Sequence, residues 1–140
     1  MDDKEYIPIN KGHHNFESEE RLSEFSNKLA VGWEKEYKEY RSDWSILPIT
    51  KDVRDYPLLV DLELSSLCNL KCPMCYTVTD EFKSKVTKGF MDFDLAKKII
   101  DEIAGKVPAL RVSLRGEPTL NKNYLKIVKY AKSKGIKEVS

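Results

Sequence analysis

Strands and helices alternate along residues 57–140, and this alternation limits the fold more than any other feature of the 140-residue chain. Residues 58–64 (LLVDLEL) and 109–114 (ALRVSL) alternate apolar and polar side chains, as half-buried strands do. Residues 136–140 begin a third such segment. Strands joined in this way by helices form right-handed crossovers. The sequence therefore predicts an α/β fold with a parallel sheet.

Two amphipathic helices are expected between these strands. The first has Asp92 as its predicted N-cap and ends at Gly105, and the second runs from about Lys122 to Lys134. Apolar residues at helical spacing are predicted to face the sheet: Leu95, Ile99 and Ile103 in the first helix, and Leu125, Val128 and Ala131 in the second.

A helix of a different character precedes the alternating region. Ser18 is its predicted N-cap, and Pro48 and Pro57 bracket a predicted linker, residues 45–57. Steps of three and four residues place one apolar stripe along this helix: Leu22, Phe25, Leu29, Trp33, Tyr37, Tyr40 and Trp44.

The chain is accordingly divided into a flexible N-terminus (1–17), a helical extension with its linker (18–56) and the α/β part (57–140). Lys and Arg number 24 and Asp and Glu 23, so the net charge of +1 gives no signal for binding nucleic acid or a membrane. The first residues, MDDKEYIPIN, lack the basic start and apolar core of a signal peptide. We expect a cytoplasmic location, where thiols stay reduced.

All three cysteines of the chain, Cys68, Cys72 and Cys75, lie in the segment SSLCNLKCPMCY (65–76), directly after the first predicted strand. An odd number of closely spaced cysteines argues against a disulfide framework and indicates metal ligands or redox groups. An iron–sulfur cube normally takes four cysteines. Three ligands leave one iron open to a substrate or cofactor, as catalytic zinc sites keep one position free.

This segment resembles the CxxxCxxC motif of the radical S-adenosylmethionine (radical SAM) enzymes, which follows the first strand of a partial (βα)6 barrel. The resemblance implies a 4Fe-4S cluster on Cys68, Cys72 and Cys75, with the amino and carboxylate groups of S-adenosylmethionine on the open iron. It further implies that an electron from the cluster releases a 5′-deoxyadenosyl radical, which abstracts a hydrogen atom from an unknown substrate. By the same analogy, a flavodoxin or ferredoxin would supply the electron.

A second motif follows the second predicted strand. Arg115-Gly116-Glu117-Pro118 resembles the GGEP motif of the same family, with arginine in place of the first glycine. In that family the glutamate accepts a hydrogen bond from the methionine amino group, and the glycine allows close backbone approach. The resemblance assigns these roles to Glu117 and Gly116. Because ligands bind at the carboxyl ends of parallel strands, both motifs are expected on the same side of the sheet.

The neighbours of the last cysteine are candidates for contact with the adenine, since the family often has an aromatic residue just before that cysteine. This chain has Met74 there and Tyr76 on the other side. The resemblance covers residues 57–140, so the expected fold is the first half of a partial (βα)6 barrel preceded by an α-helical extension. We expect these 140 residues alone to bind a cluster poorly and not to turn over.

Two other interpretations stay open at this stage. Cys72-Pro-Met-Cys75 fits the CxxC pattern of thiol–disulfide oxidoreductases, although this leaves Cys68 without a role. The cysteines could instead hold a structural zinc with His13 or His14 as fourth ligand, in a chain that serves as an interaction module.

The polar faces of the first two predicted strands are also expected to interact. Asp61 and Glu63 alternate with the apolar residues of the first strand, as Arg111, Ser113 and Arg115 do in the second. A charge near the interior of a sheet needs a partner. We therefore predict that Arg111 pairs with Asp61 or Glu63.

Overall fold

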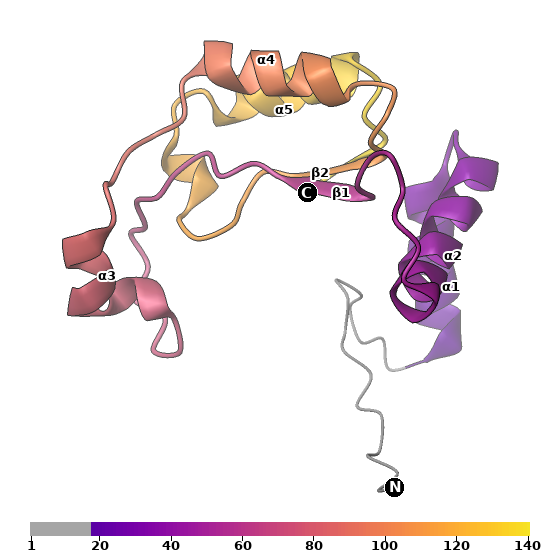
Figure 1. The fold of residues 1–140 in the computed structure, drawn as a ribbon, viewed down its shortest axis with the longest axis horizontal. Helices are drawn as coiled ribbons and strands as arrows, with labels where there is room; N and C mark the ends of the chain where they lie inside the picture. The colour runs from indigo at the N-terminus through magenta and orange to yellow at the C-terminus, as the bar shows by residue number, and fades with distance from the viewer. Residues whose placement is uncertain (1–17) are drawn as a thin grey trace, which may run out of the picture. The chain divides into compact units, whose positions relative to one another are not determined.

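The structure is a computed structural model that describes residues 18–140. The chain divides into two compact units, Met1–Val53 and Arg54–Ser140, and each is considered by itself (Figure 1). The N-terminus predicted to be flexible (1–17) lies outside the described residues, and so do the two histidines considered as zinc ligands.

The described part of the first unit contains two helices where the sequence predicted one. Helix α1 spans Glu19–Ala30 and α2 spans Glu34–Thr50. The chain turns between them at Gly32, whose φ of 80° lies in the left-handed region that glycine adopts without strain. Ser18 caps α1 as predicted, because its side chain accepts a hydrogen bond from the backbone N–H of Arg21.

Three aromatic members of the predicted stripe, Trp33, Tyr37 and Tyr40, are buried, whereas its first member, Leu22, is exposed. Trp33 contacts Tyr37 edge-on with ring centres 5.2 Å apart, and both rings lie close to Tyr40. The predicted start of the linker at residue 45 is wrong, because α2 continues through Pro48. Proline lacks the N–H that would bond the carbonyl of Trp44, and its ring crowds that carbonyl, in keeping with the end of α2 two residues later at Thr50.

The second unit is built on a parallel sheet in the order β1-β2-β3. Its strands are β1 (Leu59–Asp61), β2 (Ala109–Arg111) and β3 (Glu138–Val139). Leu59 stands opposite Ala109, and Asp61 stands opposite Arg111. The predicted α/β class with a parallel sheet is confirmed, but the strands are shorter than the predicted segments. The regular ladder ends where the chain turns toward the two motif-bearing loops.

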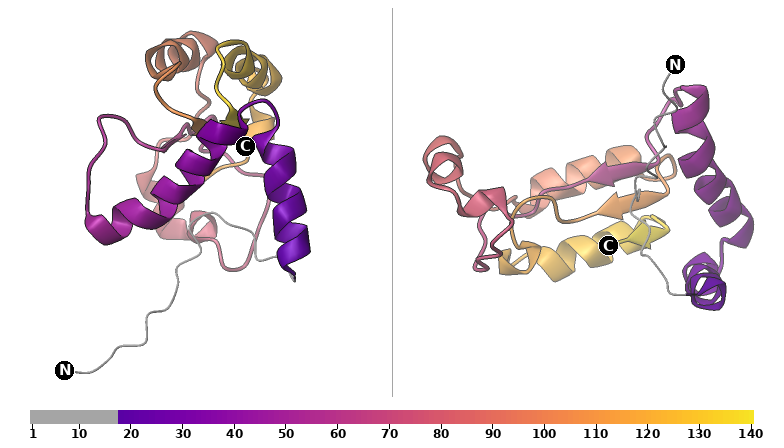
Figure 2. Two further views of the ribbon diagram at one scale, coloured as in Figure 1. Left: turned by 90° about the vertical axis from the view of Figure 1, so that its right-hand side faces the viewer. Right: turned by 90° about the horizontal axis from the view of Figure 1, so that it is seen from below.

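Two helices cover one face of this sheet, as Figure 1 and the right-hand view of Figure 2 show. Helix α4 spans Phe93–Ile103 and α5 spans Tyr124–Ser133. Asp92 caps α4 as predicted, accepting a hydrogen bond of 2.7 Å from the N–H of Leu95. Gly105 and Gly135 have left-handed φ angles just after these helices, in agreement with the predicted ends. No helix of residues 18–140 combines the length and apolar character needed to cross a bilayer.

The core lies between these helices and the sheet. Its buried residues are Leu62, Leu64, Ala96, Ile100, Leu110, Val112, Ile127, Ala131 and Ile136. Two of the residues predicted to face the sheet, Leu95 and Leu125, are instead 46% and 66% exposed, and Leu114, the last apolar residue of the predicted strand 109–114, is 56% exposed. In both helices the buried face is rotated, so that Ala96 and Ile127 point inward instead. Leu114 lies beyond the end of β2, where alternation no longer determines burial.

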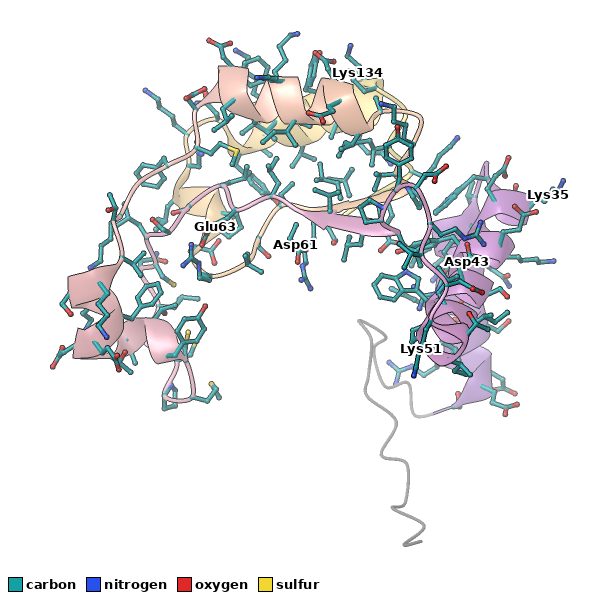
Figure 3. The ribbon with its side chains drawn as sticks, viewed as in Figure 1. Lys35, Asp43, Lys51, Asp61, Glu63 and Lys134 are labelled. Atoms are coloured by element: carbon teal, nitrogen blue, oxygen red, sulfur yellow. The ribbon has the colours of Figure 1, made fainter. Side chains whose placement is uncertain are left out.

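The opposite face of the sheet carries two ion pairs between β1 and β2 and their extensions. Arg111 donates two hydrogen bonds of 2.7 Å to the carboxylate of Asp61, so the predicted pairing is confirmed. Arg115 forms the same kind of bidentate pair with Glu63. These bonds raise the pKa of both arginines. Figure 3 shows both carboxylates on the side of β1 that faces away from α4 and α5.

A cluster of charges joins α4 to α5. The carboxylate of Asp101 accepts hydrogen bonds from Lys134 (2.7 Å), Lys97 (2.8 Å) and the hydroxyl of Tyr130 (2.6 Å). The bond from Lys134, followed by those from Lys97 and Tyr130, holds the pKa of Asp101 well below its ordinary value of 3.8. A carboxyl whose pKa is lowered by folding stabilises the folded state above its unfolded pKa.

We therefore expect Asp101→Asn to lower the urea midpoint of unfolding at neutral pH. The difference from the wild type should shrink as the pH falls below the unfolded pKa of 3.8, because the unfolded wild type then binds a proton that the folded protein, with its lowered Asp101 pKa, does not bind. Urea titrations of both proteins at pH 7 and at about pH 3 measure this. A difference that stays constant between the two pH values would contradict the assignment.

Candidate functional site

The cysteine loop, residues 65–75, leaves the sheet just beyond the carboxyl end of β1. Its base is closed by a second segment of the chain, residues 87–91. Ser66 donates from its backbone to the carbonyl of Gly89 (3.1 Å), and its hydroxyl accepts a hydrogen bond from the N–H of Gly89 (2.8 Å). Next to it, the N–H of Met91 donates to the carbonyl of Leu64 at 3.0 Å. The stretch of chain that carries the cysteines thus leaves the sheet and returns to it at the same place.

The cysteines themselves lie at the surface of the loop. Cys68 and Cys72 are exposed and Cys75 is half-buried. The backbone N–H of Cys75 donates to the carbonyl of Cys72 at 3.0 Å, which makes a turn of the CxxC segment. The sulfur of Cys75 lies 3.0 Å from the hydroxyl of Thr77. Hydrogen bonds from the side chain and the backbone of Thr77 lower the pKa of the Cys75 thiol.

The three cysteines form no single-ion metal site in this structure. Within residues 18–140, no three His, Cys, Asp or Glu side chains are close enough to hold one metal ion. The chemistry of the donors nevertheless fits a metal centre, because thiolates are the ligands that iron–sulfur clusters and structural zinc take. Exposure of two of the three thiols leaves them accessible to an incoming metal.

The second motif lies directly against the base of the cysteine loop. The backbone N–H of Glu117 donates to the carbonyl of Leu67 at 2.8 Å. A Cβ atom on Gly116 would stand 2.1 Å from the carbonyl oxygen of Ser65 and 2.6 Å from that of Leu67. Only glycine fits in this contact, so the structure gives Gly116 a role between two loops of the protein itself.

The side chain of Glu117 caps a short 3₁₀ helix, Pro118–Leu120. Its carboxylate accepts hydrogen bonds from the hydroxyl (2.6 Å) and the backbone N–H (3.1 Å) of Thr119. Both bonds lower the pKa of Glu117. The carboxylate is therefore stabilised as an anion beside the cysteine loop.

The two residues predicted to contact an adenine have different surroundings. Met74, near the end of the cysteine loop sequence, is 85% exposed. Tyr76 is also exposed, but its ring meets Phe82 edge-on with centres 5.3 Å apart. Phe82 belongs to α3 (Asp80–Lys85), the short helix that follows the loop.

Sequence reasoning missed Asn121, which is only 2% exposed. Its side-chain amide donates to the carbonyls of Leu64 and Met91, both at 2.8 Å, and its oxygen accepts a bond from the N–H of Asn123 at 2.9 Å. One side chain thus ties together the chain before the cysteine loop, the chain after it and the chain after the second motif. An asparagine just before a predicted helix is a signal for a cap, but nothing in the sequence reveals these distant carbonyls.

A cavity of about 440 Å³ lies between the cysteine loop and the segment that follows it. Three lysines, Lys71, Lys83 and Lys88, contribute to its wall. Of the three cysteines, Cys68 is the one that lines it. The cavity and the second motif share one residue of the cysteine loop, Leu67, which lines the cavity and accepts the hydrogen bond from Glu117.

No protein-family model matches the chain, and no solved structure matches it. A tungsten-containing aldehyde ferredoxin oxidoreductase cofactor-modifying protein from Pyrococcus furiosus is 38% identical over 77 residues. The match covers 53% of this chain and 20% of that protein, so the chain corresponds to about a fifth of the relative's length.

Proposed function

We propose that this chain carries the cluster-binding and S-adenosylmethionine-binding loops of a radical SAM enzyme. The observation that carries the proposal is the backbone contact between the two motifs. Glu117 donates to the carbonyl of Leu67, the residue before Cys68, and Gly116 permits the close approach. Two motifs separated by about forty residues of sequence therefore meet at the carboxyl ends of neighbouring parallel strands, which is where ligands bind in such sheets.

The arrangement of helices supports the finer expectation of a partial (βα)6 barrel. The strands follow one another in sequence order, β1-β2-β3, and α4 and α5 lie on one face of the sheet (Figure 1). Barrels are wound in this way, whereas doubly wound sheets reverse their strand order and carry helices on both faces. The charged face with its ion pairs would then line the inside of the barrel.

In this proposal Cys68, Cys72 and Cys75 hold a 4Fe-4S cluster. When bound, the cluster would supply the electron that splits S-adenosylmethionine into methionine and a radical able to abstract a hydrogen atom. Glu117 is already ionised, since its pKa is lowered, and it would accept a hydrogen bond from the amino group of the methionine part. Tyr76 and Met74 would lie near the adenine.

The name of the relative offers a substrate class for the whole protein. That protein is described as modifying the cofactor of a tungsten-containing oxidoreductase, and we propose an enzyme cofactor as a candidate substrate here too. A cytoplasmic location and a flavodoxin or ferredoxin as electron donor complete the proposal.

The test is anaerobic reconstitution of the protein at its natural length, followed by analysis of iron and acid-labile sulfide. About four of each per chain are expected, with most of both lost in Cys68→Ala. The electron paramagnetic resonance spectrum of the reduced protein should change when S-adenosylmethionine is added. One zinc per chain would favour the interaction module instead, and a reversible Cys72–Cys75 disulfide without metal would favour the oxidoreductase.

A further inference from the structure

Arg115 connects the sheet to the segment that follows the cysteines. Its Nε and Nη2 atoms donate to the two carboxylate oxygens of Glu63 at 2.8 and 2.5 Å. On its other side, the centre of its guanidinium group lies 5.8 Å from the centre of the Phe82 ring. That ring in turn contacts Tyr76. One side chain thus links the extension of β1, the second motif and the residue after Cys75.

The segment that Arg115 reaches has little else to hold it. Residues 76–85, here called the arm, comprise a 3₁₀ turn (Tyr76–Val78) and the six-residue helix α3, and neither contains a buried residue. A helix this short is not stable by itself. The half-buried ring of Phe82 is therefore an important point of attachment, and Arg115 covers it.

Arginine is the residue type suited to this position. Its planar guanidinium can bind a carboxylate through two parallel hydrogen bonds and still lie against an aromatic ring. The pair is also partly shielded from water, because the side chains of Arg115 and Glu63 are 34% and 20% exposed. A guanidinium and a ring within about 6 Å attract each other, more strongly where water is partly excluded.

We infer that Arg115 is a positioning residue that holds the arm against the sheet through Glu63 and Phe82, and so sets where Cys75 and Tyr76 stand relative to Glu117. The inference extends the proposed function, since its consequence is the fit of S-adenosylmethionine between the two motifs. The attachment of the arm, however, depends only on this chain and can be tested without a cluster.

The chain offers a matched control for this residue. Arg111, four residues before Arg115, makes the same bidentate pair with Asp61 on the same face of the sheet. Arg111→Gln removes an ion pair of the same type from the sheet. Arg115→Gln removes the ion pair with Glu63 together with the cation–π contact with Phe82. Any general effect of losing an ion pair appears in both variants.

Hydrogen exchange followed by mass spectrometry of the metal-free protein tests the attachment. In Arg115→Gln we expect peptides from the arm to exchange about tenfold faster, as follows from losing a charge-assisted pair and a cation–π contact. Peptides from α4 and α5 should be unchanged, and Arg111→Gln should leave the arm at the wild-type rate. Phe82→Leu should also increase the exchange rate of the arm peptides. In the double variant, Arg115→Gln with Phe82→Leu, these peptides should exchange no faster than in the faster of the two single variants. An arm that exchanges at the wild-type rate in Arg115→Gln overturns the inference, and so does equal acceleration throughout the unit.

A second measurement separates the inference from the proposed function. In reconstituted protein, Arg115→Gln should keep its iron content but bind S-adenosylmethionine about tenfold more weakly, with Arg115→Lys between this variant and the wild type. Unchanged affinity in Arg115→Gln overturns the consequence for the cofactor. If the wild type binds no cluster at all, the proposed function fails, while the exchange rates of the arm still decide the role of Arg115.

Discussion

Gly116→Ala is expected to separate the two motif loops and to destabilise the protein strongly. The added methyl carbon would lie 2.1 Å from the carbonyl oxygen of Ser65 and 2.6 Å from that of Leu67. Both are backbone atoms, so no side chain can rotate to make room. The loops must move apart, which breaks the hydrogen bond from Glu117 to Leu67. We expect a loss of about 3 kcal/mol in the free energy of unfolding, from overpacking and the lost bond together.

Gly89 provides the control for this substitution. It lies on the segment that closes the same loop, but a methyl group there would meet nothing within 4 Å, and its φ is not in the left-handed region. Gly89→Ala is therefore expected to change the free energy of unfolding by less than about 1 kcal/mol. Urea unfolding of the wild type and both variants measures the difference. Equal effects of the two substitutions would show that the close approach at Gly116 does not matter.

The parts of the fold that follow from local rules could be predicted from the sequence. Asp92 and Ser18 cap helices because a short polar side chain before an apolar repeat satisfies free N–H groups. The pairing of Arg111 followed from alternation, which places charged residues of adjacent parallel strands on one face. These predictions required knowledge of neighbours at fixed spacing and nothing more.

The predictions of helix faces and helix ends were wrong where tertiary packing, not local spacing, determines the structure. The spacing of Leu95 and Leu125 allowed a buried face through either residue, but the sheet selects the face through Ala96 and Ile127, one or two positions further along. The break at Gly32 interrupts a stripe that looks continuous, because Trp33 to Tyr40 keep the helical spacing after the turn. Periodicity alone cannot distinguish these cases.

For the candidate site, the sequence placed both motif loops on one side of the sheet but did not predict the contacts that join them. Gly116 was singled out by resemblance, with a role toward a cofactor, whereas the structure adds a contact with Ser65, fifty-one residues earlier in the chain. The link from Arg115 to Phe82 and the bonds of Asn121 likewise join segments that are distant in sequence. Such contacts depend on how the loops fold over the sheet edge, and no local pattern encodes them.

Asn121→Asp is expected to be the most damaging isosteric change in the second unit. The amide nitrogen of Asn121 donates to two carbonyl oxygens, those of Leu64 and Met91. A carboxylate of the same shape would place a buried negative charge against both acceptors. At pH 7 we expect a loss of about 3 kcal/mol or more, because two donated bonds disappear and the charge lacks a partner.

The destabilisation caused by Asn121→Asp should depend on pH. Burial against two carbonyls should raise the pKa of the introduced carboxyl above the ordinary value of about 3.9. The variant then binds more protons when folded, so its destabilisation should be smallest at about pH 4 and should grow as the pH rises toward 7. Asn123→Asp is the control, since Asn123 is half-buried at the start of α5 and its side chain makes no cap bond there. A carboxylate at that position favours the helix dipole, so the control should stay within about 0.5 kcal/mol of the wild type. If both variants unfold at the same urea concentration at pH 7, Asn121 does not tie the three segments together.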